Sequence, residues 1–141
     1  MKDLNNKVAL LTGASSGIGA VTANLLTQNG VTVIGVARSK SGLNNTKSII
    51  ENHGGEFHCI PFDISQTSKL SELKDQVINI VGDVDILINN AGIEEYNYFQ
   101  DYDLKYIEKI TKVNLIAGME LTRQFLPQML DRGGHIVNIC S

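Results

Sequence analysis

The chain has 141 residues, of which 43% are hydrophobic and 19% are charged, and its formal net charge is -3. This size and composition are typical of one globular domain, residues 1–141, and the chain is too short for two. The lysines are scattered, and no apolar run approaches the ~18 residues of a membrane span, which argues against nucleic-acid and membrane partners. The N-terminus lacks the apolar segment of a signal peptide, so we expect a cytoplasmic protein.

Apolar runs alternate with amphipathic segments along the whole chain. The predicted strands are 8–12, 32–37, 57–61, 86–89 and 135–140, and the predicted helices are 17–29, 46–53, 68–81 and 104–130. Glycines stand where these helices should end, namely Gly30, Gly54 and Gly55, Gly82, and Gly133 and Gly134. Strands that alternate with helices predict an α/β fold with a parallel sheet covered on both faces.

The longest predicted helix contains Pro127, which removes one N–H group and clashes with the preceding turn. It predicts either a kink near Gln124 or a new turn close to Pro127.

Cysteine and histidine positions argue against disulfides and metal sites. Cys59 and Cys140 fall in predicted strands that lie far apart in such a sheet. A disulfide requires Cα atoms within ~7 Å, so we expect two free thiols. The histidines show no ligand spacing with cysteine or carboxylates, so no metal is expected.

A glycine-rich turn, residues 12–19, joins the first predicted strand to the first helix. Its glycines are Gly13, Gly17 and Gly19, and its polar residues include Ser15 and Ser16. Unpaired N–H groups at a helix N-terminus attract an anion, and the missing side chains let it approach the backbone. The spacing is neither Gly-x-Gly-x-x-Gly nor a P-loop, so the turn alone leaves a dinucleotide site and a purely structural turn open.

Two further segments follow strands at the same sheet edge. Asn90, Ala91 and Gly92 follow the fourth predicted strand, where small residues let a ribose lie against the backbone. Asp63 follows the third, where its carboxylate can accept from an adenine amino group. A cap for the following helix is the competing interpretation of Asp63.

NAD-specific folds carry an acidic residue at the end of the second strand, where this chain has Ala37 followed by Arg38. Its guanidinium can bind a 2′-phosphate with two hydrogen bonds, and Ser39 or Ser15 can add a hydroxyl. A solvated surface arginine is the alternative. The residue favours NADP(H), with NAD(H) as the less favoured cofactor.

The turn Thr-Gly-x-x-x-Gly-x-Gly, Asp63, the segment Asn-Asn-Ala-Gly, Asn114 and the final segment 136–141 together resemble the short-chain dehydrogenase/reductase family. This resemblance runs in order along the whole chain. It implies a Rossmann-type doubly wound parallel sheet of strand order 3-2-1-4-5 and an oxidoreductase that moves a hydride between a nicotinamide and a small-molecule carbonyl or alcohol. The implied cofactor-binding residues are Gly13, Ser15, Ser16, Gly17, Ile18, Gly19, Arg38, Asp63, Ile64, Asn90, Ala91 and Gly92.

The resemblance also assigns catalytic residues. Asn114 matches the proton-relay asparagine and Ser141 the serine that orients the carbonyl, but the catalytic Tyr-x-x-x-Lys pair is absent. No tyrosine has a lysine four residues later, and all four precede the fifth predicted strand. We therefore expect a sheet that is incomplete at its C-terminal side, and one face of the fifth strand and its neighbours without cover.

Three interpretations of the chain stay open at this point. The first is the cofactor-binding part, truncated before the Tyr/Lys pair, of an NADP-dependent reductase whose full-length parent is a homo-oligomer. The second is a non-catalytic dinucleotide-binding fragment. The third is a pseudoenzyme subunit that pairs with a full-length homologue.

Overall fold

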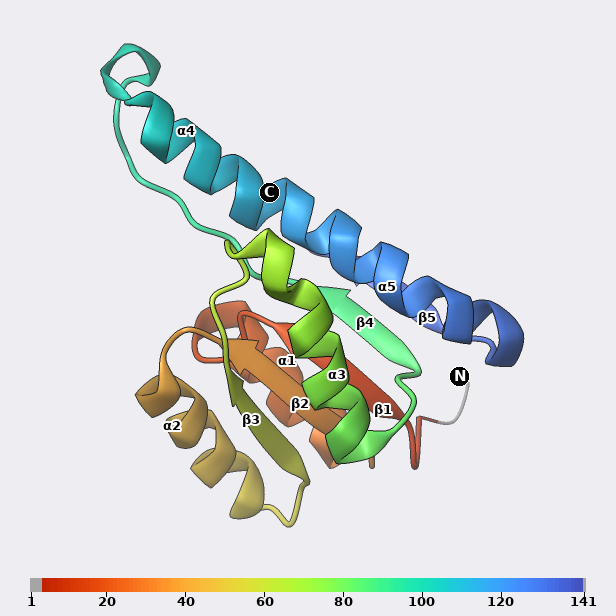
Figure 1. Cartoon of the computed structure of the whole chain (residues 1–141). Coiled ribbons are helices and arrows are strands. Elements are labelled where there is room, and N and C mark those ends of the chain that lie inside the picture. The colour runs from red at the N-terminus through yellow and green to blue at the C-terminus, as the bar shows by residue number, and fades with distance from the viewer. Residues whose placement is uncertain (1–3, 141) are drawn as a thin grey trace.

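The computed structural model describes residues 4–140 and contains one parallel sheet (Figure 1). Its strands are β1 (Val8–Thr12), β2 (Thr32–Ala37), β3 (Phe57–Pro61), β4 (Ile86–Asn89) and β5 (His135–Asn138). They are arranged in the order β3-β2-β1-β4-β5. This order confirms the predicted Rossmann-type sheet, and it places Cys59 and Cys140, both free thiols, at opposite edges.

Helices cover both faces of the sheet. They are α1 (Gly17–Gln28), α2 (Lys40–Glu51), α3 (Leu70–Val81), α4 (Leu104–Thr111) and α5 (Ala117–Arg132), with 3-10 turns at Thr67–Lys69 and Phe99–Asp101 and a π-helical segment at Lys112–Ile116. The glycines predicted to end helices, Gly30, Gly54, Gly82 and Gly133, adopt positive φ angles of 77°, 74°, 73° and 78°. No helix in residues 4–140 combines the length and the hydropathy needed to cross a lipid bilayer.

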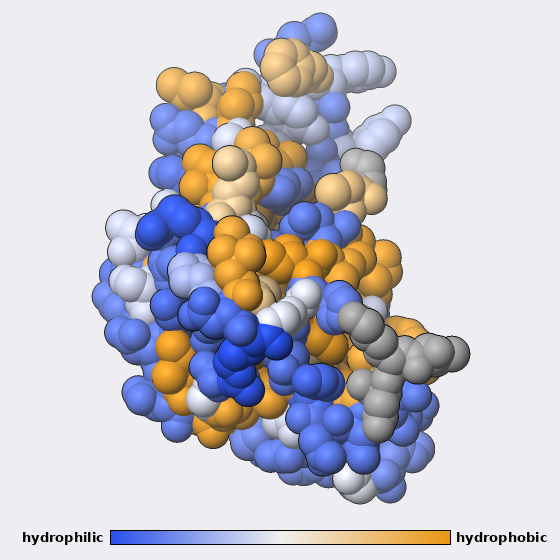
Figure 2. Space-filling view, turned by 90° about the vertical axis from the view of Figure 1, so that its right-hand side faces the viewer, coloured by the Kyte–Doolittle hydropathy of each residue, from blue (hydrophilic) through white to orange (hydrophobic). Residues whose placement is uncertain are grey.

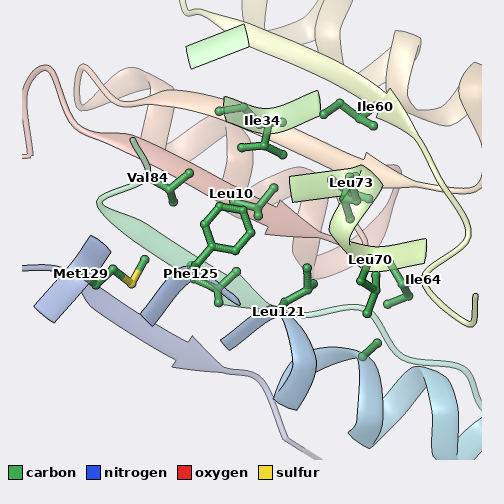
Figure 3. Packing of buried hydrophobic residues seen from close by; sticks show 14 of the residues in the cluster. Leu10, Ile34, Ile60, Ile64, Leu70, Leu73, Val84, Leu121, Phe125 and Met129 are labelled. Carbon is green, nitrogen blue, oxygen red and sulfur yellow. The ribbon is translucent and has the colours of Figure 1, made fainter. Parts of the chain in front are cut away.

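Two apolar layers fix the sheet between these helices. On one face, Phe125 of α5 is fully buried, and Figure 3 shows its ring beside Leu10 of β1. On the other face, Leu43 and Ile50 of α2 pack in a second cluster with Leu11 of β1. Both faces of β1 are buried, so packing on both sides fixes the position of its C-terminal end, where the glycine-rich turn begins.

The start of α2 differs from the prediction. The sequence predicted a helix over 46–53, whereas the helix begins at Lys40. Ser39 is the N-cap, and its Oγ accepts from the Gly42 backbone N–H at 3.0 Å. The prediction was wrong because serine and glycine at 39–42 resemble a turn, while the cap makes this stretch the first helical turn.

The long C-terminal helix differs too. No new turn starts at Pro127, since α5 continues through this residue to Arg132, while the kink near Gln124 stays a prediction. The buried side chains of Phe125 and Met129 flank the proline and hold the helix on the sheet. The irregularity lies at the π-helical segment Lys112–Ile116 instead, and α4 and α5 form one long rod whose α4 end projects beyond the sheet (Figure 1).

Strand β5 ends two residues earlier than predicted, although the Ile139 N–H still donates to Asn89 O at 2.9 Å. Val137 is 40% exposed and Ile139 45%, so β5 has the predicted uncovered face. Figure 2 views the molecule from the right-hand side of Figure 1 and shows hydrophobic side chains grouped on the face turned to the viewer. The same expectation is wrong for β4, whose Ile86 and Ile88 are buried.

Candidate functional site

The carboxyl ends of the strands open onto a cleft of about 830 Å³. Its walls come from the turn after β1, the end of β2, the residues after β3 and β4, and the π-helical segment. In a doubly wound sheet the crevice lies where the strand order reverses, and here β1 pairs with both β2 and β4. The volume suits a small-molecule ligand.

The cleft brings together residues from six separate segments of the sequence, the last of which is Ile139 and Cys140 after β5. All the predicted cofactor-binding residues except Gly17 line it, and so does Asn114. Gly17 begins α1 with φ +53°, and nothing lies within 4 Å of the position its Cβ would take. Ser141 lies outside the described residues.

Thr12 ties the glycine-rich turn to the segment after β4. Its buried Oγ1 accepts from the backbone N–H groups of Asn90 and Ala91, both at 3.0 Å. Asn90 also donates through its side chain, from Nδ2 to Thr12 O at 3.0 Å. Thr12 was not predicted to have a role of its own, although a polar residue at the end of a buried strand indicates a side chain with a specific hydrogen-bond partner.

The turn also folds closely on itself. A Cβ on Gly19 would lie 2.1 Å from the carbonyl oxygen of Gly13 and 2.7 Å from Asn90 Nδ2. Gly13 has φ +72°, a conformation that other residues rarely adopt. Glycine at both positions therefore lets α1 begin directly against the turn.

The N-terminus of α1 suits an anion. The Ser16 side chain makes no capping hydrogen bond, and the first turn carries no acidic residue. First-turn N–H groups without a side-chain acceptor bind phosphate well, because the helix dipole is positive at this end. These residues fit the pyrophosphate of a dinucleotide.

At the end of β2, Arg38 is exposed and lines the cleft. No carboxylate in residues 4–140 forms an ion pair with its guanidinium. The Ser39 and Ser41 hydroxyls lie nearby in sequence, 3.2 Å apart. This rim therefore presents a cation and hydroxyls to the cleft, and no acidic residue.

Asp63 uses one carboxylate oxygen locally. Its Oδ1 accepts from the backbone N–H of Ser65 at 3.0 Å, and Asp63 still lines the cleft beside Ile64. This is a local turn contact and not a helix cap, since the N-cap of the following 3-10 turn is Gln66 and that of α3 is Lys69, so the capping interpretation is wrong. The adenine interpretation stays a prediction.

Asn114 lies within the π-helical segment and holds Ile93. Its Oδ1 accepts from Ile93 N at 2.8 Å, and its Nδ2 donates to Ile93 O at 3.0 Å. Such segments occur often at functional sites. The side chain therefore fixes the chain just after Gly92 against the long helical rod.

No tyrosine is among the described residues that line the cleft. Tyr102 and Tyr106 are stacked, with ring centroids 4.8 Å apart, and line a second hollow of about 330 Å³ with Glu95. Burial of its hydroxyl raises the pKa of Tyr106, and the neighbouring Tyr102 raises it further. The resemblance implies a tyrosine of lowered pKa as the catalytic acid, and the raised pKa of Tyr106 does not match that role.

Residues 4–140 contain no group of three or more His, Cys, Asp or Glu side chains that could hold a metal ion.

The two thiols differ in accessibility, which gives a test of the cleft. Cys140 is exposed and lines the cleft, whereas Cys59 is half-buried on β3 and burial raises the pKa of its thiol. Since the thiolate is the reactive form, a thiol reagent at pH 8 is expected to modify Cys140 first. A ligand in the cleft, such as NADPH, should slow that modification. Peptide mass spectrometry measures both rates, and faster labelling of Cys59 would contradict this assignment.

Comparison with known proteins gives a consistent result. The sequence profile described as short chain dehydrogenase matches residues 7–141. The ketoacyl reductase HetN of Nostoc sp. is 49% identical over 142 residues, which are 100% of this chain and 50% of that protein. A fatty acyl-CoA reductase of Acinetobacter baylyi is 35% identical, covering 99% of this chain and 48% of that protein.

Solved structures agree. A metagenomic short-chain oxidoreductase in complex with NADP matches with TM-score 0.93 and 33% identity, over 99% of this chain and 64% of that one. A 7α-hydroxysteroid dehydrogenase complexed with NADH and 7-oxo glycochenodeoxycholic acid matches with TM-score 0.91 and 31% identity, over 98% and 54%. The chain spans about half the length of the curated relatives it matches. With its sheet order, its cleft and these matches, the chain belongs to the short-chain dehydrogenase/reductase family of oxidoreductases.

Proposed function

We propose that this chain is the NADP(H)-binding part of a short-chain oxidoreductase. The family binds a nicotinamide dinucleotide, and the observation that carries the NADP(H) proposal is Arg38 on the cleft rim. A carboxylate at this place would accept the ribose hydroxyls of NAD and repel a 2′-phosphate, whereas a guanidinium attracts the phosphate. Bound NADP in one neighbour supports the choice, while the NADH in another makes a direct test necessary.

The remaining cleft residues take roles along the cofactor. The turn from Gly13 to Gly19 holds the pyrophosphate with backbone N–H groups, and Asp63 and Ile64 hold the adenine. Asn90, Ala91 and Gly92 hold the ribose on the nicotinamide side, because small side chains there leave room against the backbone. When bound, the nicotinamide supplies or accepts the hydride.

In the whole protein, the substrate is a small-molecule carbonyl or alcohol. Asn114 and Ser141 would serve the proton relay and the orientation of the carbonyl, and the cytoplasm is the expected compartment. The names of two relatives, a ketoacyl reductase and a fatty acyl-CoA reductase, support carbonyl chemistry. The family is typically oligomeric, and we propose a homo-oligomer for the full-length parent.

A second candidate is cofactor binding without turnover by these 141 residues. One observation favours it, namely that no described tyrosine lines the cleft. Sequencing the parent gene beyond Ser141 separates the two functions, since a downstream Tyr-x-x-x-Lys motif is expected only of the first, while NADPH binding by this chain is expected of both.

Arg38→Ala tests the cofactor choice. We expect the Kd for NADPH to rise about 10-fold to 100-fold, since a hydrogen bond to a charged group contributes about 1.5–3 kcal/mol. The Kd for NADH should change less than threefold. Isothermal titration measures both constants, and Lys40→Ala, an exposed cation outside the cleft lining, is the matched control. Equal loss for both cofactors would refute the 2′-phosphate role.

A further inference from the structure

One face of α2 lies directly on the glycine-rich turn, a contact that the sequence did not predict. Thr46 is only 3% exposed, and its Oγ1 donates to the backbone carbonyl of Ala14 at 3.1 Å. Ala14 itself is fully buried, and its N–H donates to Val36 O at 3.3 Å. The Thr46 hydroxyl therefore provides the hydrogen bond that this buried carbonyl requires.

Gly42, one helical turn before Thr46, makes the second contact. A Cβ at this position would lie 2.9 Å from Ser15 Cβ and 3.0 Å from Ser15 O. Residues four apart share a helix face, so Gly42 and Thr46 meet Ser15 and Ala14 together. The absence of a side chain at Gly42 lets the helix approach the turn this closely.

The choice of residue types is not explained by helix formation. Glycine and threonine are both poorer helix formers than alanine, and valine would fill the buried volume of Thr46 without a polar atom. Both residues weaken α2 as an isolated helix. Their contacts with the glycine-rich turn therefore explain why these residue types occur in α2.

The start of α2 also carries the cationic rim of the cleft. Arg38 and the N-cap Ser39 immediately precede Lys40, the first residue of the helix. Ser15, Arg38 and Ser39 all line the cleft. The packing of α2 against the turn thus sets the distance between the Ser15 hydroxyl and the Arg38 guanidinium.

We propose that Thr46 and Gly42 are positioning residues that hold Ser15 beside Arg38 and thereby set the preference for a 2′-phosphate. This inference rests on the proposed NADP(H) site. Neither residue is among those that line the cleft. They act through the hydrogen bond to Ala14 O and the close contact with Ser15.

The test compares two small ligands that differ in the 2′-phosphate, 2′,5′-ADP and 5′-AMP, by isothermal titration of the full chain. In Thr46→Val the Kd for 2′,5′-ADP should rise about tenfold, the factor that corresponds to one lost hydrogen bond, while that for 5′-AMP rises less than threefold. Thr46→Ser keeps the donor and should restore the ratio of the two constants. A merely structural loss lowers the folded fraction and weakens both ligands equally.

Thr27→Val is the matched control. Thr27 is also a buried helical threonine, but its Oγ1 donates to Asn24 O of its own helix. Its ligand ratio should equal that of the unaltered chain.

Gly42→Ala gives an independent route should Thr46→Val fold poorly. Alanine strengthens α2 as a helix, yet its methyl group displaces Ser15. The Kd for 2′,5′-ADP should therefore rise relative to that for 5′-AMP, as in Thr46→Val. An unchanged ratio in Thr46→Val or in Gly42→Ala would overturn the positioning role alone. Equal affinity of the unaltered chain for both ligands would contradict the NADP(H) choice itself, and with it any role in selectivity.

Discussion

Gly19→Ala is expected to weaken NADPH binding by roughly 100-fold or more, which is the free energy of severe overpacking converted to affinity. The added Cβ would lie 2.1 Å from Gly13 O, a backbone atom that no rotamer change can move. Relief requires the turn to separate from the start of α1, and this separation removes the close array of N–H groups that an anion needs. Titration with NADPH, followed by its fluorescence, measures the loss.

Gly54→Ala is the control for this substitution. Gly54 has φ +74°, but nothing lies within 4 Å of its added Cβ, and the residue is outside the cleft lining. The control should lose some stability through backbone strain and keep its NADPH affinity. NADPH binding by Gly19→Ala within threefold of the unaltered chain would show that the turn does not hold the pyrophosphate.

Thr12→Val is expected to lower the free energy of unfolding by about 2 kcal/mol, because two partly buried N–H donors lose their acceptor, each at the lower end of roughly 1–3 kcal/mol. The donors are the backbone groups of Asn90 and Ala91. Valine matches threonine in shape, so the loss reports the hydroxyl and not a cavity. Urea unfolding followed by circular dichroism measures it.

Two further variants serve as controls for Thr12→Val. Thr12→Ser keeps the acceptor and should retain most of the stability. Thr32→Val removes the exposed hydrogen bond from Thr32 Oγ1 to Glu56 and should change the free energy of unfolding by less than about 1 kcal/mol. A loss as small as that in Thr12→Val would mean that Thr12 does not tie the two cleft segments together.

Sequence reasoning located strands β1 to β4 at their observed bounds, because each is an apolar run bounded by glycine or polar residues. It failed where a single local contact decides the structure. Ser39 starts α2 six residues early through one cap, and buried neighbours carry α5 through Pro127. The π-helical segment around Asn114 left no recognisable pattern in the sequence.

The cleft, too, was predictable from the sequence only in part. Topology alone brings the carboxyl ends of parallel strands to one edge, so the motifs could be assigned to a common cleft before the structure was known. The bonds that shape the cleft join Thr12 to Asn90, 78 residues apart, and Thr46 to Ala14, 32 residues apart. Neither the hydrophobic periodicity nor a motif of one segment carries information about partners so far away in the sequence.

NADP(H) binding in the cleft beside the glycine-rich turn is tested by isothermal titration of the chain with NADPH and, separately, with NADH. We expect saturable binding of one NADPH per chain and a Kd at least about tenfold higher for NADH, the ratio that one charge-assisted contact gives. Equal affinities would contradict the role of Arg38, and the absence of saturable binding with either cofactor would contradict the site as a whole.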